Sequence, residues 1–171
     1  MIFIRIIDII GYSGSGKTFL ITEFIKLLKK NLNYNVAVLK NVKHHPIDRK
    51  GKDSFIFRES GATYSVIQNK NFETGIFFNL KDLNIENLLL WLEKGPNTLD
   101  LLLTEGFRIL DNPAILCVSN LEDIEGQLTE RIKIISGIIC SKETDKKQFL
   151  NIPIIDIKKN FLKFLEIFDI E

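Results

Sequence analysis

The sequence predicts a three-layer α/β fold in which helices cover a mostly parallel sheet. Segments rich in Val, Ile, Leu and Phe alternate with segments of helical periodicity along the 171 residues. The strand-like segments are apolar almost throughout, as expected for strands buried on both faces of a parallel sheet. The length suits one domain with a sizeable core, so we expect a single nucleotide-binding domain over residues 1–171.

The first forty residues are predicted to form a strand, a helix and a second strand. Residues 2–10 are almost all β-branched or Phe, which indicates a buried strand. After a Gly-rich turn, apolar residues recur at helical spacing: Leu20, Phe24, Leu27 and Leu28. Residues 34–40 then form a second strand, and the unit is long enough for the right-handed crossover of a βαβ motif.

The next segment is predicted to be a functional loop followed by a short helix and a hairpin. Residues 41–53 are polar and basic, and a loop of this length commonly carries function. A helix over about 52–60 ends at Gly61, which can adopt the left-handed conformation of a helix stop. Two β-rich runs within 62–78, joined by Asn-Lys-Asn, predict a β-hairpin extension.

The rest of the chain is predicted to supply further helices and strands. Residues 84–95 form a helix that ends at Gly95 and Pro96, and we expect Trp91 in the core. Residues 99–107 form a buried strand with an acidic end. Shorter strands are expected over 115–118, 132–139 and 154–157, and a last helix over 158–168.

Composition narrows the class of protein. A formal charge of +1 gives no general attraction to nucleic acid or anionic lipid, and 45% hydrophobic with 26% charged residues is typical of a globular chain. No apolar run approaches the roughly 20 residues of a spanning helix, and the start lacks the features of a signal peptide. We therefore expect a cytoplasmic protein that binds neither nucleic acid nor membrane.

The two cysteines are expected to be free. Cys117 and Cys140 both lie in apolar, strand-like surroundings, where thiols pack as small hydrophobic side chains. The sequence has no CxxC or HExxH spacing. We therefore predict neither a disulfide nor a zinc site.

The segment GYSGSGKT, residues 11–18, matches the phosphate-binding pattern G-x-x-x-x-G-K-[ST] at every defined position. Glycines let the backbone turn so that successive N–H groups face an anionic phosphate beside the positive end of a helix. Lys17 supplies a charge for the β- and γ-phosphates, and Thr18 offers a hydroxyl to Mg²⁺. Because the segment lies between a buried strand and an amphipathic helix, we predict a P-loop NTPase whose nucleotide contacts are Gly11, Ser13, Gly14, Ser15, Gly16, Lys17 and Thr18.

An acidic residue at the end of a neighbouring strand usually completes such a site by holding the metal. Glu105 follows an apolar run and a Thr, and it is the best candidate for this role. We therefore predict Thr18 and Glu105 as metal ligands and Lys17 and Glu105 as the catalytic groups. Asp100, at the other end of the strand, is expected to be a cap or turn residue.

Basic residues gather in and after the polar loop: Lys43, His44, His45, Arg49, Lys50, Lys52 and Arg58. Taken singly, each of these side chains is expected to be solvated. Taken as a cluster, they give a second anion site and a merely solvated surface about equal odds. We include Lys43, His44 and Asp53 among the predicted nucleotide contacts. Asp53 is expected to cap the short helix, with a place near the γ-phosphate and metal as the alternative.

Four motifs, taken in order, resemble the molybdopterin-guanine dinucleotide biosynthesis protein B family: GYSGSGKT, VLKNVKHH, RKGKDSFIFRESGAT and LLLTEGF. The first is shared by very many NTPases, but the ordered set over residues 11–107 is specific. Beyond residue 110 the likeness rests on overall length and a late IPIID strand.

The resemblance implies a GTP-binding protein with weak Mg²⁺-dependent GTPase activity that assists the attachment of GMP to molybdopterin. It implies three partners: the molybdenum cofactor guanylyltransferase, molybdopterin, and a second copy of the chain that pairs through the hairpin. By position it assigns phosphate and Mg²⁺ contacts to Gly14, Gly16, Lys17 and Thr18. Glu105 becomes the metal-side acid, and Lys43, His44 and Asp53 become its neighbours.

Two other functions stay open from the residues themselves. One is a small-molecule or nucleotide kinase in which the basic segment 43–58 closes over an acceptor. The other is a nucleotide-gated adaptor that uses ATP and whose output is a partner interaction. The guanine-reading motif N-K-x-D is missing, since residues 120–123 are NLED and residues 140–144 offer only a Ser-Lys pair. Guanine preference therefore follows from the resemblance alone.

Hydrolysis is expected to be slow. The sequence offers no residue well placed to orient an attacking water, and Arg108 is the nearest candidate for an arginine finger.

Overall fold

A five-stranded parallel sheet is the centre of the larger of two units into which the chain divides. The computed structural model describes residues 4–43, 45–78, 84–142 and 147–171. The first unit comprises Met1–Asn41 and Gly95–Glu171, and the second comprises Val42–Lys94. The single domain predicted over residues 1–171 stays a prediction.

The sheet of the first unit confirms the predicted α/β class with a mostly parallel sheet. Its strands are β1 (Arg5–Ile10), β2 (Val36–Lys40), β5 (Leu101–Glu105), β6 (Ala114–Cys117) and β7 (Ile132–Ser136). They lie in the order β2-β5-β1-β6-β7, and each neighbouring pair is parallel. The carboxyl ends of the strands therefore meet at one edge, where α/β proteins bind their ligands.

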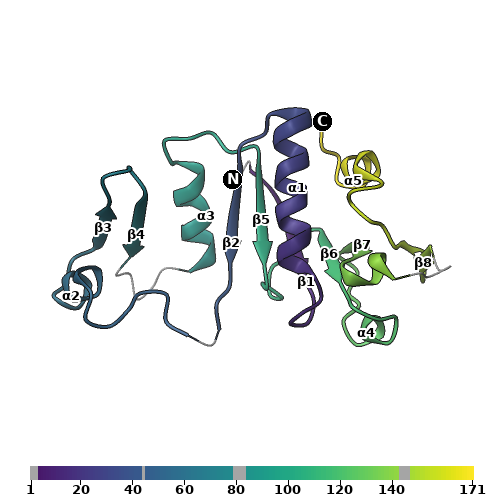
Figure 1. Cartoon of the computed structure of the whole chain (residues 1–171), viewed down its shortest axis with the longest axis horizontal. Coiled ribbons are helices and arrows are strands. Elements are labelled where there is room, and N and C mark those ends of the chain that lie inside the picture. The colour runs from purple at the N-terminus through teal and green to yellow at the C-terminus, as the bar shows by residue number, and fades with distance from the viewer. Residues whose placement is uncertain (1–3, 44, 79–83, 143–146) are drawn as a thin grey trace. The chain divides into compact units, whose positions relative to one another are not determined.

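Two apolar clusters stabilise this sheet. In the first, α1 (Lys17–Leu32) lies across the sheet (Figure 1) and buries Phe24 and Leu28 against Ile7 and Ile9 of β1, as the helical spacing predicts. The helix α5 (Phe161–Ile167) adds Phe164 to the same cluster. The second cluster contains Ile10 and residues of α4 (Glu122–Glu125) and the 3₁₀ turn η1 (Ile138–Ser141). None of the described helices has the length and apolar character needed to cross a membrane.

The second unit contains the predicted hairpin and two helices. Its elements are α2 (Asp53–Glu59), β3 (Tyr64–Gln68), β4 (Thr74–Phe78) and α3 (Ile85–Glu93). The strands pair antiparallel with Val66 opposite Ile76, which confirms the hairpin. The expected core position of Trp91 is wrong. Its side chain is 38% exposed and meets the ring of Phe78 edge-on, because α3 turns Leu89 rather than Trp91 fully inward.

Several predicted boundaries near the C-terminus are wrong for local reasons. The strand predicted over 132–139 ends at Ser136, because Gly137 adopts a φ of 97° and η1 follows. The strand predicted over 154–157 makes a single parallel bridge between Ile135 and Ile154. It is preceded by a short hairpin of β8 (Gln148–Phe149) and β9 (Ile152–Pro153). The last helix begins at Phe161 because Asp156 accepts the amide of Lys158 and holds a turn first.

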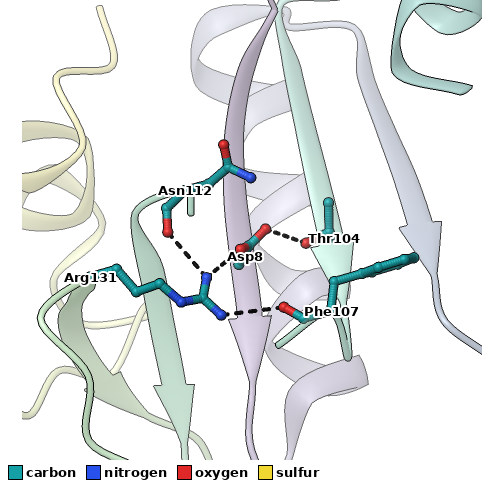
Figure 2. A network of polar contacts seen from close by, with 5 residues as sticks. All are labelled: Asp8, Thr104, Phe107, Asn112 and Arg131. Carbon is teal, nitrogen blue, oxygen red and sulfur yellow. Dashed lines mark hydrogen bonds and ion pairs between the residues drawn. The ribbon is translucent and has the colours of Figure 1, made fainter. Parts of the chain in front are cut away.

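A buried carboxylate joins β1 to its surroundings (Figure 2). Asp8 is fully buried; its carboxylate accepts a hydrogen bond from Thr104 of β5 and pairs with Arg131. Arg131 also donates to the carbonyl oxygens of Phe107 (3.3 Å) and Asn112 (3.2 Å), both in the β5–β6 loop. Burial raises the pKa of Asp8, while the hydrogen bonds from Thr104 and Arg131 oppose the rise.

Candidate nucleotide site

Residues 11–18 form the turn between β1 and α1, as predicted. Gly14 and Gly16 adopt φ values of 74° and 93°, in the left-handed region that favours glycine. A Cβ on Gly11 would lie 2.1 Å from the carbonyl oxygen of Cys117. Gly11 is therefore required by the close approach of β6, in addition to the predicted need for a tight turn.

The turn presents hydrogen-bond donors that the protein does not use. In the described part of the chain, the amides of Gly14 and Gly16 donate to no protein acceptor. The ammonium of Lys17 folds back onto the turn and donates to the carbonyl oxygens of Gly11 (3.1 Å) and Tyr12 (2.7 Å). A turn with free amides and a lysine within reach suits a phosphate group, so the residues present fit the predicted ligand.

A cavity of about 590 Å³ opens at this turn. Its lining residues come from the turn, the first residues of α1, the ends of β2 and β5, and η1: Ser13, Gly14, Gly16, Lys17, Thr18, Phe19, Lys40, Glu105, Gly137, Ile138 and Ser141. The structure thus brings together the predicted residues Ser13, Gly14, Gly16, Lys17, Thr18 and Glu105. Among the predicted turn residues, Ser15 is 2% exposed and lies under the turn rather than in the cavity lining.

Thr18 and Glu105, the two predicted metal ligands, face the same cavity. Glu105 ends β5, opposite Ile9 of β1, and it is only 8% exposed. Groups of three or more His, Cys, Asp or Glu side chains that could hold a metal are absent from the described residues. A hydroxyl and one carboxylate suit Mg²⁺ that also takes oxygens from a nucleotide and water.

Lys40 is a site residue that the sequence analysis missed. It ends β2, pairs in register with Glu105, and its ammonium lies 3.1 Å from a Glu105 carboxylate oxygen. Its position at the carboxyl end of the second strand of the predicted βαβ unit is the sequence feature that indicates a place near the ligand. The ion pair offsets the charge of Glu105 and engages one of its two carboxylate oxygens, so a cation held by this carboxylate competes with Lys40 for its charge.

Glu105→Gln is expected to lower the apparent affinity for Mg²⁺ in the presence of nucleotide by about 10- to 100-fold, because an amide is a poor Mg²⁺ ligand. Calorimetric titrations with GTP over a range of Mg²⁺ concentrations measure the effect. Asp100→Asn is the matched control. Asp100 lies just before the start of β5 and accepts the amide of Asn35 at 2.7 Å, as expected for a turn residue. A wild-type magnesium response in Glu105→Gln would remove the metal role.

Two further residues border the turn. Burial raises the pKa of Cys117 to about 12, so its thiol stays protonated and packs in the core as predicted. Arg108 donates to Gln127 (2.6 Å), and its guanidinium lies 5.9 Å from the centre of the Tyr12 ring. Arg108 therefore contacts the turn through Tyr12, and its role as a candidate arginine finger stays a prediction.

The basic residues after β2 belong to the second unit. Lys43, His45 and Lys52 are exposed, and His44 lies outside the described residues. Arg58 pairs with Asp48 at 3.5 Å, which reduces the free positive charge of the cluster. The roles of Lys43, His44 and Asp53 toward a nucleotide, and the second anion site, stay predictions.

The predicted cap of the short helix is wrong. Lys52 is the N-cap residue of α2, and no side chain makes a capping hydrogen bond there. Asp53 is instead the first helical residue, where its charge still favours the positive helix end. The buried carboxylate of this region is Asp48, which accepts a hydrogen bond from Ser54 at 2.8 Å.

Comparison with known proteins adds a family. The family model described as MobB, "Molybdopterin guanine dinucleotide synthesis protein B", matches residues 6–140. The chain is 31% identical over 115 residues to the "Molybdopterin-guanine dinucleotide biosynthesis adapter protein" of Haemophilus influenzae. That alignment covers 66% of this chain and 62% of the relative, so the chain spans less than two thirds of the relative's length.

Solved structures show the same fold. MobB of Bacillus subtilis superposes with a TM-score of 0.71 and 22% identity, over 94% of this chain and 96% of that chain. A MobB homologue from Bacillus stearothermophilus superposes with a TM-score of 0.64 and 18% identity, over 94% of each chain. The likeness extends past residue 110, where the motifs of the sequence end.

Proposed function

Because the chain belongs to the molybdopterin guanine dinucleotide synthesis protein B family, we propose that it is a GTP-binding adapter of molybdenum cofactor biosynthesis in the cytoplasm. The observation that carries the proposal is the cavity at the Gly-rich turn, where Lys17, Thr18 and Glu105 converge. The name of the Haemophilus relative supports the adapter role, since it describes a biosynthesis adapter protein.

The chain's own residues bind and orient the triphosphate. The free amides of the turn and the start of α1 hold the phosphates, and Lys17 leaves the carbonyl oxygens of Gly11 and Tyr12 to contact them. Thr18 and Glu105 would hold Mg²⁺, which neutralises phosphate charge when it is bound. Lys40 lies beside Glu105 in the same cavity, where its ammonium would be a second positive charge for a phosphate oxygen.

Hydrolysis at this site is slow in our proposal. Among the described residues that line the cavity, the single carboxylate is Glu105, and none is a His, Asn or Gln that could orient water. A carboxylate that holds the metal is not free to act as a general base. Weak GTPase activity suits an adapter, because the bound nucleotide then persists long enough to report on partner binding.

The partner in this proposal is the guanylyltransferase that attaches GMP to molybdopterin. Purified guanylyltransferase, with and without molybdopterin, is passed over the immobilised chain with GTP and Mg²⁺, with GDP, or with no nucleotide. We expect retention that depends on GTP. Retention in none of the three conditions contradicts the adapter role, and transfer of the γ-phosphate to a small molecule supports the kinase alternative.

We also propose that two copies of the chain pair through the hairpin of the second unit. In the described residues β3 and β4 form a two-stranded sheet, so each strand leaves one edge open to pairing. Val66 and Ile76 lie opposite each other in that sheet, and they are 57% and 42% exposed. An exposed apolar cross-strand pair is typical of a surface covered by a partner.

The double variant Val66→Lys, Ile76→Lys is expected to sediment as a monomer under conditions where the wild type is a dimer, because lysines on both copies repel each other. Phe72→Ser is the matched control, since Phe72 is 80% exposed but lies in the turn of the hairpin. A monomeric wild type, or a dimer that survives the double variant, contradicts pairing through the hairpin.

A further inference from the structure

One wall of the cavity is η1, which the structure fixes against the Gly-rich turn. The amide of Ile138 donates to the carbonyl oxygen of Ser15 at 3.1 Å. A Cβ on Gly137 would lie 2.3 Å from the same oxygen, so only glycine allows this contact. The segment Gly137–Ser141 is therefore a rigid part of the site.

The sheet order separates this wall from the metal side. Lys40 and Glu105 end β2 and β5, on one side of β1, whereas η1 follows β7 on the other side. With phosphate at the turn and the metal beside Glu105, the rest of a nucleotide extends toward η1. Two of the lining side chains are apolar and exposed, Phe19 (58%) and Ile138 (39%). The ammonium of Lys158 lies 4.8 Å from the centre of the Phe19 ring, whereas Ile138 belongs to η1 and can cover one face of a base.

Polar residues come next in the sequence after those that line the η1 side of the cavity, which we call the rim. Ser141 lines the cavity, and the next residue, Lys142, donates from its ammonium to the side-chain oxygen of Asn120 at 2.5 Å. Ser119, next to Asn120, donates to the carbonyl oxygen of Gly14 at 3.5 Å. The pair of Asn120 and Lys142 therefore joins the loop after β6 to the end of η1, and each of the two residues is the sequence neighbour of one that lines the cavity or contacts the Gly-rich turn.

This pair presents donors. The ammonium of Lys142 has three N–H groups and no acceptor, and it donates one of them to the side-chain oxygen of Asn120. The NH₂ group of Asn120 is a further donor. At position 6, guanine and hypoxanthine carry an acceptor oxygen, whereas adenine carries an NH₂ donor. A rim of donors favours the first two bases and opposes the third.

We propose that Lys142, held by Asn120, is the specificity-determining residue that selects 6-oxopurine nucleotides over 6-aminopurine nucleotides. The inference rests on the proposed nucleotide-binding function and assigns its base recognition. It replaces the missing N-K-x-D motif by a lysine from one loop and an asparagine from another. The described rim also holds a carboxylate, since Asp123 accepts the backbone amide of Asn120 at 3.1 Å, so the proposal for Lys142 concerns position 6 of the base and leaves the 2-amino group unassigned.

The test compares GTP, ITP and ATP by calorimetric titration of the full chain with Mg²⁺. We expect GTP and ITP each to bind roughly tenfold more tightly than ATP, as for the gain of a charged hydrogen bond at position 6. Lys142→Ala is expected to lower the affinity for GTP and ITP to that for ATP, and Lys142→Arg to keep the preference because it keeps the donors. Lys133→Ala, an exposed lysine of β7, is the matched control.

The outcomes separate the inference from the function on which it rests. If the wild type binds none of the three nucleotides, the proposed function fails and the inference fails with it. If the wild type prefers GTP but Lys142→Ala keeps that preference, the function stands and the inference is overturned. Thermal unfolding of Lys142→Ala checks that the variant is folded.

Discussion

Lys17→Ala is expected to weaken GTP binding about 100-fold, through the loss of charged hydrogen bonds worth roughly 1.5–3 kcal/mol each. No other described side chain of the turn carries a positive charge, whereas the backbone amides of the turn are unchanged by the substitution. The binding that remains should therefore come from those amides. Calorimetric titration with GTP and Mg²⁺ measures the loss.

The fold is expected to survive this substitution, because in the structure Lys17 bonds only to the turn itself, at Gly11 and Tyr12. Lys30→Ala provides the matched control, since Lys30 is an exposed lysine in the last turn of the same helix. We expect wild-type affinity in that variant. If Lys17→Ala bound GTP as tightly as the wild type, the turn would not be the phosphate site and the proposed function would lose its main support.

Arg131→Met is expected to lower the free energy of unfolding by about 3–5 kcal/mol, because it leaves the Asp8 carboxylate buried without its partner. Asp8 is fully buried and the Arg131 side chain is 12% exposed, so water replaces little of the lost interaction. Arg131 also holds the carbonyl oxygens of Phe107 and Asn112, so the loop after Glu105 loosens as well (Figure 2). Urea unfolding followed by circular dichroism measures the loss.

The free energy of unfolding that Arg131→Met loses should be smaller at acidic pH than at neutral pH. The pKa of Asp8 is already raised above its ordinary 3.8 by burial, and removal of Arg131 raises it further. The folded state then binds a proton more tightly than the unfolded state, so stability falls as pH rises above the unfolded pKa toward the folded pKa. The deficit relative to the wild type is therefore expected to be smaller at acidic than at neutral pH.

Two variants test this account of Asp8. The double variant Asp8→Asn, Arg131→Met should lose less stability than Arg131→Met alone, because no unpaired charge stays buried. Lys133→Met, an exposed change in β7 two residues after Arg131, should alter stability by less than about 0.5 kcal/mol. A pH-independent deficit in Arg131→Met would contradict the role of the Asp8 charge.

Elements with a strong local pattern were predictable from the sequence. The turn at residues 11–18 combines defined residue types at fixed spacing, and the helix after it repeats apolar residues that the structure buries. The hairpin, with β-rich runs around a polar turn, was likewise found within two residues of its observed ends. Glu105 was assigned to this site because it follows an apolar run and a Thr in a chain with such a turn, and the structure places it in the lining of the cavity, while its metal role stays a prediction.

Features that depend on residues far apart in the chain were decided by the tertiary structure. Lys40 reaches Glu105 only because β2 and β5 are neighbours in the sheet, and Asp8 meets Arg131 across 123 positions of sequence. Lys142 reaches Asn120 in the same way, from one loop to another. The sequence by itself determined the local conformations and the Gly-rich turn, since those depend on spacing and residue type. The sheet order brought the charged partners together, because ion pairs and hydrogen bonds act through distance in space, which the order of residues does not contain.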